Sequence, residues 1–224
     1  MSAKAPPALL IEDTPCPLCL SGQTSFFHED ARRLYIRCSN CWLVFVPTGQ
    51  LPTAAEEKAQ YDLHCNNPND GGYRQFLQRA LEPVVKYVTP PASGLDFGCG
   101  PGPTLSVMLT EQGYTVADYD PVYFNHTALL DQQYDFVTCT EVIEHVHAPA
   151  KIWALLKRLL KTDGLLVIMT KRVISDQAFA NWHYKNDPTH VRFYSLQTFE
   201  YLAGLLGLSL TVCSDDVVVF HRSG

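Results

Sequence analysis

Four of the eight cysteines stand in two close pairs whose spacing is typical of metal ligands. Cys16 and Cys19 form the first pair, Cys38 and Cys41 form the second, and 18 residues lie between the pairs. Two such pairs can place four thiolates tetrahedrally around one Zn²⁺ ion. Because four cysteines leave no open coordination position, the predicted zinc is structural and not catalytic. The spacing also leaves open two redox disulfides, or thiols without metal.

The segment between the two cysteine pairs predicts the small fold that such a site stabilises. Its apolar residues indicate an antiparallel hairpin: Phe26, Phe27, Leu34, Tyr35 and Ile36. A module of this size buries too little apolar surface to fold alone, so metal binding would supply much of its folding free energy. Residues 12–48 therefore resemble a zinc ribbon.

A second chemical signal is a glycine-rich turn after a buried strand. Gly98, Gly100 and Gly102 follow this strand, and a helix is predicted to begin at Pro103 or Thr104. Glycine lets a ligand approach the backbone and leaves the helix N-terminus open. The next predicted strand ends at Asp120, whose carboxylate can accept hydrogen bonds from both hydroxyls of a ribose. The spacing is not that of a dinucleotide fingerprint, and no phosphate loop is present, which counts against nicotinamide cofactors and nucleoside triphosphates.

Two stretches around Asp120 carry a family resemblance: LDFGCGPG at 95–102 and YDFVTCTEVIEHV at 134–146. With that acid they resemble class I S-adenosylmethionine-dependent methyltransferases, over about residues 73 to 221. The resemblance implies S-adenosyl-L-methionine as cofactor and a cofactor site made by Asp96, Gly98, Cys99, Gly100, Gly102, Tyr119, Asp120, Thr140 and Glu141. Tyr134 follows Asp120 by only 14 positions, so we expect the third strand of this family to be reduced or absent. The adenine contact is correspondingly open, with Tyr119, Pro121 and Asn125 as candidates.

Methyl transfer requires alignment of a nucleophile with the methyl group and sometimes removal of a proton. Sites on parallel sheets lie at the carboxyl ends of strands, which directs attention to residues 141–145 and 182–194. We predict His145, His190 and Glu141 as catalytic residues, with either histidine as a general base.

Two other interpretations of these residues stay open. One is a second divalent metal that orients a pair of substrate hydroxyls, held by Glu141, Glu144, His145 and His190. The ExxEH pattern resembles ubiquinone-pathway O-methyltransferases and small-RNA 2′-O-methyltransferases, in which such residues hold a metal. The other is a structural role, in which the carboxylates cap a helix that begins after Glu141 and His145 bonds to the backbone.

The elements that position these residues alternate between strand and helix after Pro91, which predicts an α/β fold with a mostly parallel, Rossmann-like methyltransferase sheet. We divide the chain into a zinc ribbon at 12–48, a helical lid or linker at 53–90 and an S-adenosylmethionine-binding methyltransferase domain at 91–224. Helices are predicted near 54–65, 73–88, 150–161 and 195–206. The lid offers candidate substrate contacts in Tyr61, His64, Tyr73, Arg74 and Phe76.

The composition limits the kinds of partner that the protein can bind. The formal net charge of −6 argues against a general nucleic-acid binder, although it does not exclude a local basic patch. No apolar run has the length of a membrane span, and no signal-peptide pattern is visible, so we expect a cytoplasmic protein without a membrane partner.

We predict a methyltransferase for a small-molecule oxygen, nitrogen or carbon. The alternatives are an RNA or protein methyltransferase that uses the ribbon for recognition, and a catalytically inactive cofactor-binding protein. The sequence leaves the oligomeric state open.

Overall fold

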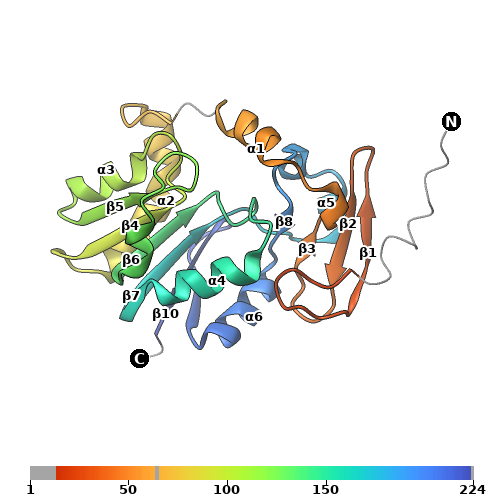
Figure 1. Cartoon of the computed structure of the whole chain (residues 1–224). Coiled ribbons are helices and arrows are strands. Elements are labelled where there is room, and N and C mark those ends of the chain that lie inside the picture. Colours follow the sequence, from red (N-terminus) through yellow and green to blue (C-terminus); the bar gives the residue numbers. More distant parts are fainter. Residues whose placement is uncertain (1–13, 64–65, 223–224) are drawn as a thin grey trace.

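The computed structural model describes residues 14–63 and 66–222 of the 224-residue chain. Its centre is a six-stranded sheet in the order β5-β4-β6-β7-β10-β9 (Figure 1). The strands from β5 to β7 run parallel, and β10 runs antiparallel to both of its neighbours. The bounds in chain order are β4 (Ser93–Phe97), β5 (Thr115–Tyr119), β6 (Tyr134–Thr140), β7 (Leu160–Met169), β9 (Ser209–Val212) and β10 (Val217–His221). The predicted α/β fold with a mostly parallel sheet is confirmed.

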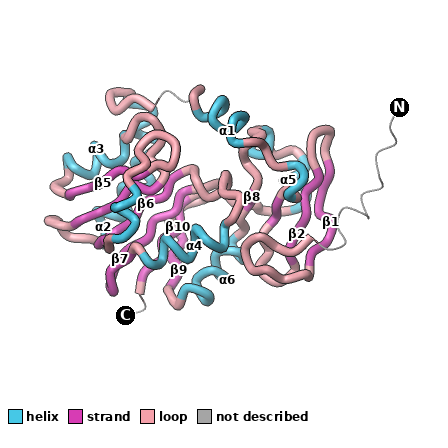
Figure 2. The backbone as a smooth tube through the Cα atoms, viewed as in Figure 1, coloured by secondary structure: helices cyan, strands magenta, loops and turns pink. Residues whose placement is uncertain are grey.

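Helices cover both faces of this sheet, as Figure 2 shows. Because side chains alternate along a strand, Leu165 and Val167 of β7 pack in one apolar cluster and Leu166 and Ile168 pack in another. The first cluster includes residues of α2 (Gly71–Tyr87) and α3 (Thr104–Glu111), and the second includes residues of α4 (Pro149–Arg158) and α6 (Leu196–Leu206). This two-sided burial explains why the central strands are apolar throughout.

The segment after β5 confirms that the third strand is absent from the described sheet. Asp120 forms a single bridge with Phe124, and a 3₁₀ turn, η3 (Thr127–Asp131), leads directly to β6. As a result β5 is the edge strand, and its carboxyl end stands beside the glycine turn that follows β4.

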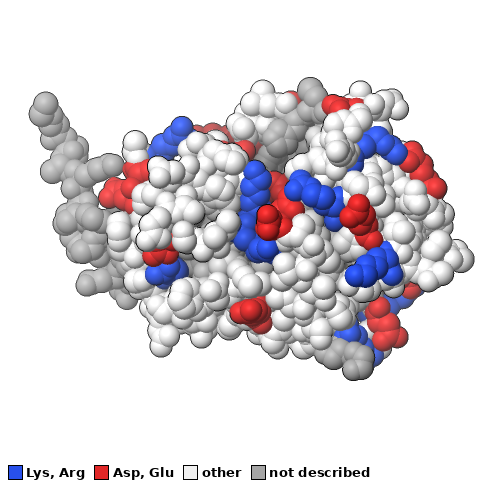
Figure 3. Space-filling view, turned by 180° about the vertical axis from the view of Figure 1, so that it is seen from behind, with Lys and Arg blue, Asp and Glu red and all other residues white. Residues whose placement is uncertain are grey.

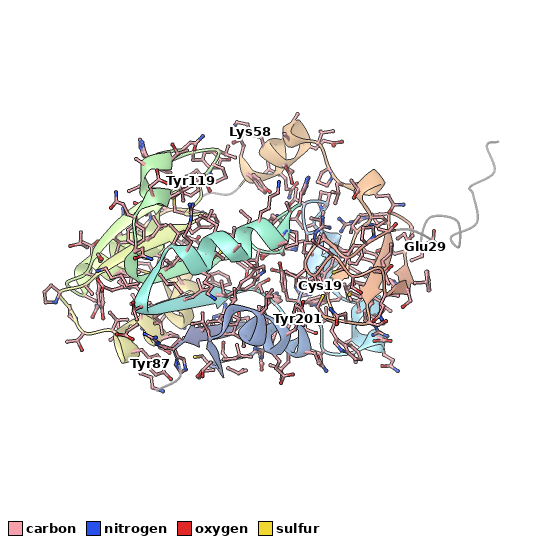
Figure 4. All side chains as sticks on the ribbon, turned by 60° about the horizontal axis from the view of Figure 1, so that its bottom comes forward. Cys19, Glu29, Lys58, Tyr87, Tyr119 and Tyr201 are labelled. Atoms are coloured by element: carbon pink, nitrogen blue, oxygen red, sulfur yellow. The ribbon has the colours of Figure 1, made fainter. Side chains whose placement is uncertain are left out.

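The N-terminal cysteine module forms a second, smaller sheet with the order β1-β2-β3-β8. The predicted hairpin is present as β1 (Thr24–Glu29) and β2 (Leu34–Cys38), followed by β3 (Val44–Phe45). The fourth strand, β8 (Arg192–Phe193), comes from the long segment between β7 and α6. Figure 4 shows Cys19 of this module beside Tyr201 of α6. The module is therefore joined both to the main core and to the segment that carries His190.

One sequence prediction about local structure is wrong, and a helix that was left open as an alternative is not found. The helix predicted at 150–161 ends at Arg158, and β7 begins at Leu160 and runs through the polar residues up to Gly164. Residues 141–145 form a turn and not a helix, with Glu141 at a positive φ of 52°. This turn directs the following side chains back toward the end of the sheet.

The segment between β7 and α6 contains two short helices, α5 (Asp176–Ala180) and the 3₁₀ turn η4 (His183–Asn186). Between the cysteine module and the main sheet the chain forms η2 (Thr48–Gln50) and α1 (Ala54–Tyr61), and α1 lies along the top of Figure 1 between the two sheets. None of the helices that the structure describes is both long and apolar enough to span a bilayer.

Candidate functional site

One cavity of about 560 Å³ lies where β4, β5 and β6 end. Eight of the nine predicted cofactor-binding residues line it: Asp96, Gly98, Cys99, Gly100, Tyr119, Asp120, Thr140 and Glu141. The ninth, Gly102, packs instead against the chain before α2, where an added Cβ would meet the Asn66 backbone oxygen at 1.8 Å. The predicted catalytic residues His145 and His190 line the other side of the same cavity.

The turn after β4 owes its shape to glycine. Gly98 and Gly100 have φ values of 79° and 66°, which residues with a Cβ rarely adopt. An added Cβ at Gly98 would also lie 2.4 Å from Val142 Cγ2. The Gly98 amide donates to the Tyr119 carbonyl at 2.7 Å, which joins the turn to the end of β5. The turn and the acid at position 120 therefore form one rigid wall of the cavity.

Asp120 is 8% exposed and holds this wall together. Its Oδ2 accepts a hydrogen bond from the Gly100 amide at 3.1 Å, and its Oδ1 accepts from the Val122 and Tyr123 amides at 2.8 and 3.1 Å. A carboxylate offers about four acceptor positions, so three are used by the backbone. Oδ2 keeps capacity for one further donor from a ligand in the cavity.

Asp96 lies deeper, at 3% exposure, and its Oδ1 accepts a hydrogen bond from the Thr138 hydroxyl at 2.7 Å. Burial raises the pKa of Asp96 to about 7, against the effect of that hydrogen bond and with a further contribution from Asp118 and Asp120. Near neutral pH this carboxyl group can therefore exist as an acid that donates a hydrogen bond into the cavity.

Two carboxyl groups that follow β6, those of Glu141 and Glu144, contact the same phenol. The Tyr184 hydroxyl lies 2.5 Å from Glu144 Oε1, 3.2 Å from Glu141 Oε2 and 3.1 Å from the Thr170 hydroxyl. Glu144 is fully buried and does not line the cavity, whereas Glu141 does. Burial raises the pKa of Glu141 to about 7, and burial together with the neighbouring Glu141 raises that of Glu144. Glu141 can therefore hold or release a proton near neutral pH.

The two histidines meet across the turn after β6. Their ring centroids are 4.6 Å apart at an interplanar angle of 74°. The Glu144 carbonyl accepts hydrogen bonds from the Val191 and Arg192 amides at 2.8 and 2.9 Å, which brings the two segments together. His190 Nδ1 lies 2.7 Å from the Tyr184 carbonyl. Because a carbonyl only accepts, Nδ1 carries the proton in this bond, and Nε2 is the nitrogen that can accept.

Three side chains here have metal-ligand geometry. One ligand atom each of Glu144, His145 and His190 lies within 4.8 Å of the others. Glu141 is not part of this group, so the structure brings together three of the four residues predicted for a second metal. The bond from His190 Nδ1 to a carbonyl is the outer contact that orients many histidine ligands.

Helix α1 and the start of α2 form the outer wall of the cavity. The rings of Tyr61 and His145 form a T-shaped pair with centroids 5.3 Å apart, and Glu57 pairs with His147 at 2.8 Å. Tyr73 and Phe76 also line the cavity. Arg74 instead donates to the Pro68 carbonyl and pairs with Glu111. His64 lies outside the described residues.

Some site residues were missed in the sequence. Tyr184 stood within the aromatic segment 182–194 but showed no spacing that linked it to the carboxylates that follow β6. Glu57 and Asn66 likewise line the cavity without a motif. Among the adenine candidates, Tyr119 and Pro121 line the cavity, and Asn125 is not among its lining residues.

The four paired cysteines converge at the base of the cysteine module. Cys16 Sγ lies 3.4 Å from Cys41 Sγ, Cys19 Sγ lies 3.5 Å from Cys38 Sγ, and all four sulfurs lie within 4.8 Å of one another. A tetrahedral zinc with Zn–S bonds of about 2.3 Å separates its sulfurs by about 3.8 Å, so the donor set fits that ion. Leu20 and Trp42, which follow the two pairs, have φ values of 61° and 62°.

Comparison with known proteins agrees with this geometry. The sequence profile of the family described as "Methyltransferase domain" matches residues 70–211. The ubiquinone biosynthesis O-methyltransferase of Haemophilus ducreyi is 33% identical over 99 residues, which cover 42% of this chain and 40% of that protein. The match to the same enzyme of Salmonella paratyphi A covers 32% of its length, so the chain spans between about a third and two fifths of these curated relatives.

Solved structures show the same fold. The 1,6-didemethyltoxoflavin-N1-methyltransferase of Burkholderia thailandensis, bound to 1,6-didemethyltoxoflavin and S-adenosylhomocysteine, has a TM-score of 0.54 at 15% identity. The match covers 88% of this chain and 98% of that one. The magnesium protoporphyrin IX methyltransferase of Synechocystis, bound to S-adenosylhomocysteine, has a TM-score of 0.50 at 17% identity. The match covers 75% of this chain and 94% of that one.

Proposed function

The chain belongs to the methyltransferase-domain family, and from that premise we propose that it transfers a methyl group from S-adenosylmethionine to an oxygen, nitrogen or carbon of a small molecule. When bound, this cofactor supplies a methyl group already activated by a sulfonium. The protein must then hold the cofactor, align the acceptor and remove a proton where the acceptor requires it.

One observation carries the proposal: a single cavity of about 560 Å³ is lined on one side by the glycine turn and Asp120 and on the other by His145 and His190. The first side suits an adenosyl ligand, since Asp120 Oδ2 retains capacity for a ribose hydroxyl. The second side offers imidazole side chains, the type of group that most often acts as a general base. The presence of these ionisable groups also argues against a purely cofactor-binding protein.

Cofactor binding is tested by calorimetric titration of the protein with S-adenosylhomocysteine. We expect binding by the wild type, and a loss of about 10- to 100-fold in affinity for Asp120→Asn, because the amide offers fewer acceptor positions to the backbone and the ribose. Asp131→Asn is the matched control, because Asp131 is an exposed acid in η3. Equal affinities for the two variants would remove Asp120 from the site.

The acceptor is tested by transfer of a labelled methyl group to panels of phenols, alcohols and amines. Ubiquinone biosynthesis O-methyltransferases are among the relatives, which supports a hydroxyl acceptor first. On the face shown in Figure 3, the described Lys and Arg residues are interspersed with Asp and Glu and form no extended basic patch, which supports a small molecule over RNA. Transfer to RNA or to a protein in the same assay would favour the alternative acceptor class.

A metal-assisted variant of this function is supported by the grouping of Glu144, His145 and His190. Two imidazoles and one carboxylate suit a divalent first-row metal, which would orient oxygen atoms of an acceptor. Titration with Mn²⁺, followed by paramagnetic broadening of the His145 and His190 ring signals, tests the site without an activity assay. Binding to the wild type and not to His190→Gln would support it, and the absence of broadening would leave the histidines as candidate bases alone.

The cysteine module is proposed to hold one structural zinc through Cys16, Cys19, Cys38 and Cys41. The sulfur positions support this assignment over disulfides, because the pairs Cys16–Cys41 and Cys19–Cys38, which join different CxxC loops, have S–S distances of 3.4 and 3.5 Å, far beyond a bonded distance of about 2.05 Å. Elemental analysis should give one zinc per chain.

A further inference from the structure

The loop that carries His190 is held by a residue from the cysteine module. Arg33 Nη1 donates to the carbonyls of Pro188 and His190 at 2.9 and 3.0 Å. Its Nη2 donates to the carbonyls of Lys185 and Asp187 at 2.7 and 3.1 Å. One guanidinium thus binds four carbonyls within six residues.

The turn that presents Arg33 is itself fixed on both sides. Asp30 Oδ1 accepts hydrogen bonds from the Arg32 and Arg33 amides at 2.9 and 3.0 Å, which closes the β1–β2 turn. Asp30 Oδ2 accepts from Lys185 Nζ at 2.7 Å and from the Tyr35 hydroxyl at 3.0 Å. Arg33 is 8% exposed and Lys185 is 6% exposed, so these contacts are largely shielded from water. The turn and the loop form one interlocked unit.

The orientation of the His190 ring depends on the shape of this loop. Its Nδ1 bonds to the carbonyl of Tyr184, and its ring packs on the Tyr184 ring with centroids 4.1 Å apart. Its backbone amide donates to the Asp187 carbonyl at 3.3 Å, and its own carbonyl is bound by Arg33. These contacts therefore depend on the loop that the guanidinium holds and on Tyr184, which directly precedes it.

We propose that Arg33 is a positioning residue for methyl transfer, which fixes the loop 185–190 from the cysteine module so that His190 faces the cavity beside His145. The inference rests on the proposed function, because it gives His190 a part in the chemistry. It also gives the cysteine module a role: the hairpin it supports supplies a clamp for the catalytic loop. Arginine suits this role because its planar fork carries five donors, whereas lysine presents three from a single point.

The test compares Arg33→Met and Arg33→Lys with Arg37→Met in the full-length zinc-loaded chain. Arg37 lies on the same hairpin and pairs with Asp176 at 2.9 Å, outside the loop 185–190. The readouts are zinc content, affinity for S-adenosylhomocysteine, hydrogen exchange of residues 183–191 and the ring NMR signals of His190, assigned with His190→Gln. None of these requires the acceptor to be known.

We expect Arg33→Met to retain zinc and to bind S-adenosylhomocysteine within about twofold of the wild type, because Arg33 does not line the cavity. Exchange in residues 183–191 should accelerate about tenfold or more, and the His190 ring signals should shift. Arg33→Lys should give an intermediate effect, and Arg37→Met should match the wild type in all four readouts.

Two results would overturn the proposal. In the first, Arg33→Met leaves both the hydrogen exchange of residues 183–191 and the His190 ring signals unchanged. In the second, hydrogen exchange accelerates equally throughout the hairpin and the loop, as it would after a general loss of stability. If Arg33→Met does not fold, Arg33→Lys decides by the same criteria. Failure of the proposed function is distinguishable, because the wild type would then not bind S-adenosylhomocysteine while the exchange pattern still reports on the clamp.

Discussion

Buried carboxyl groups gather at the ends of β4 and β6, and their protonation couples the site to pH. Burial raises the pKa of Asp96 to about 7, from an ordinary value of 3.8. Between these values the folded state retains a proton that the unfolded state has lost, so the Asp96 contribution to stability falls as pH rises from about 4 to about 7. Above about 7 that contribution is constant.

Asp96→Asn removes this pH dependence while keeping an acceptor for Thr138. In the absence of ligand we expect the melting temperature of the variant, relative to the wild type, to be higher at pH 8 than at pH 5 by about 4 °C or more. Thermal unfolding monitored by circular dichroism at both pH values measures the difference. If the melting temperatures of variant and wild type differ by the same amount at pH 5 and at pH 8, the Asp96 carboxyl titrates in its ordinary range.

Tyr184 is the residue on which both site carboxylates converge. Tyr184→Phe would leave Glu144 buried without its 2.5 Å donor, so we expect a loss of about 1–3 kcal/mol in the free energy of unfolding and a fall of about tenfold or more in kcat. Urea denaturation and the labelled-methyl assay measure the two effects.

Tyr194→Phe is the control for Tyr184→Phe. Tyr194 is also buried, but its hydroxyl accepts from Trp153 Nε1 at 3.2 Å and donates to the Ile143 carbonyl at 3.4 Å. We expect it to lower stability and to leave kcat within about twofold. If both variants lose the same fraction of kcat, Tyr184 acts through stability alone.

At the scale of elements, helix α6 offers two glycines with opposite roles. Gly204 lies inside the helix, and Gly207 ends it at a positive φ of 64°; an added Cβ would meet no atom within 4 Å at either position. Gly204→Ala should therefore stabilise the protein by about 0.5–1 kcal/mol, and Gly207→Ala should destabilise it by about 1 kcal/mol. Urea denaturation of the two variants measures both changes in the free energy of unfolding. Changes of the same sign would contradict the local conformational argument.

The limits of the sequence prediction also appear at this scale. The absence of a third strand followed from the distance between Asp120 and Tyr134, because 14 positions do not allow a helix and a strand. The start of β7 was missed because the polar residues before Leu165 resemble the end of a helix. A helix after β6 stayed open because the ExxEH spacing suits one face of a helix, whereas the positive φ at Glu141 has no signature in that residue type.

Contacts between residues far apart in the sequence could not be predicted, for a different reason. The glycine turn and Asp120 were predictable because their roles depend on local backbone geometry. Arg33 contacts residues about 155 positions away, and Tyr184 reaches Glu144 across 40 positions. Neither contact leaves a periodic pattern, because each joins segments that meet only in the folded chain: the cysteine module and the loop 185–190 in the first case, and η4 and the turn after β6 in the second.

At the scale of the whole molecule, the cysteine module and the large sheet share one core. Cys16, Leu34 and Phe45 belong to the same buried cluster as Leu95 and Leu166 of the sheet. The β3–β8 pairing and the Arg33 contacts tie the module to a segment inserted after β7. Separate unfolding of the module would expose that shared core, so the two parts should unfold together.

Cys38→Ser tests this cooperativity, with Cys213→Ser as the control because Cys213 is exposed and lies outside the four-cysteine group. We expect Cys38→Ser to lose zinc and to lower the urea midpoint of the whole chain, since the metal contributes folding free energy to both parts. Hydrogen exchange along the urea titration should show peptides of β2 and of β6 opening at the same concentration in wild type and variant. Earlier opening of β2 than of β6 would mean that the module is an independent unit and that its metal does not stabilise the catalytic sheet.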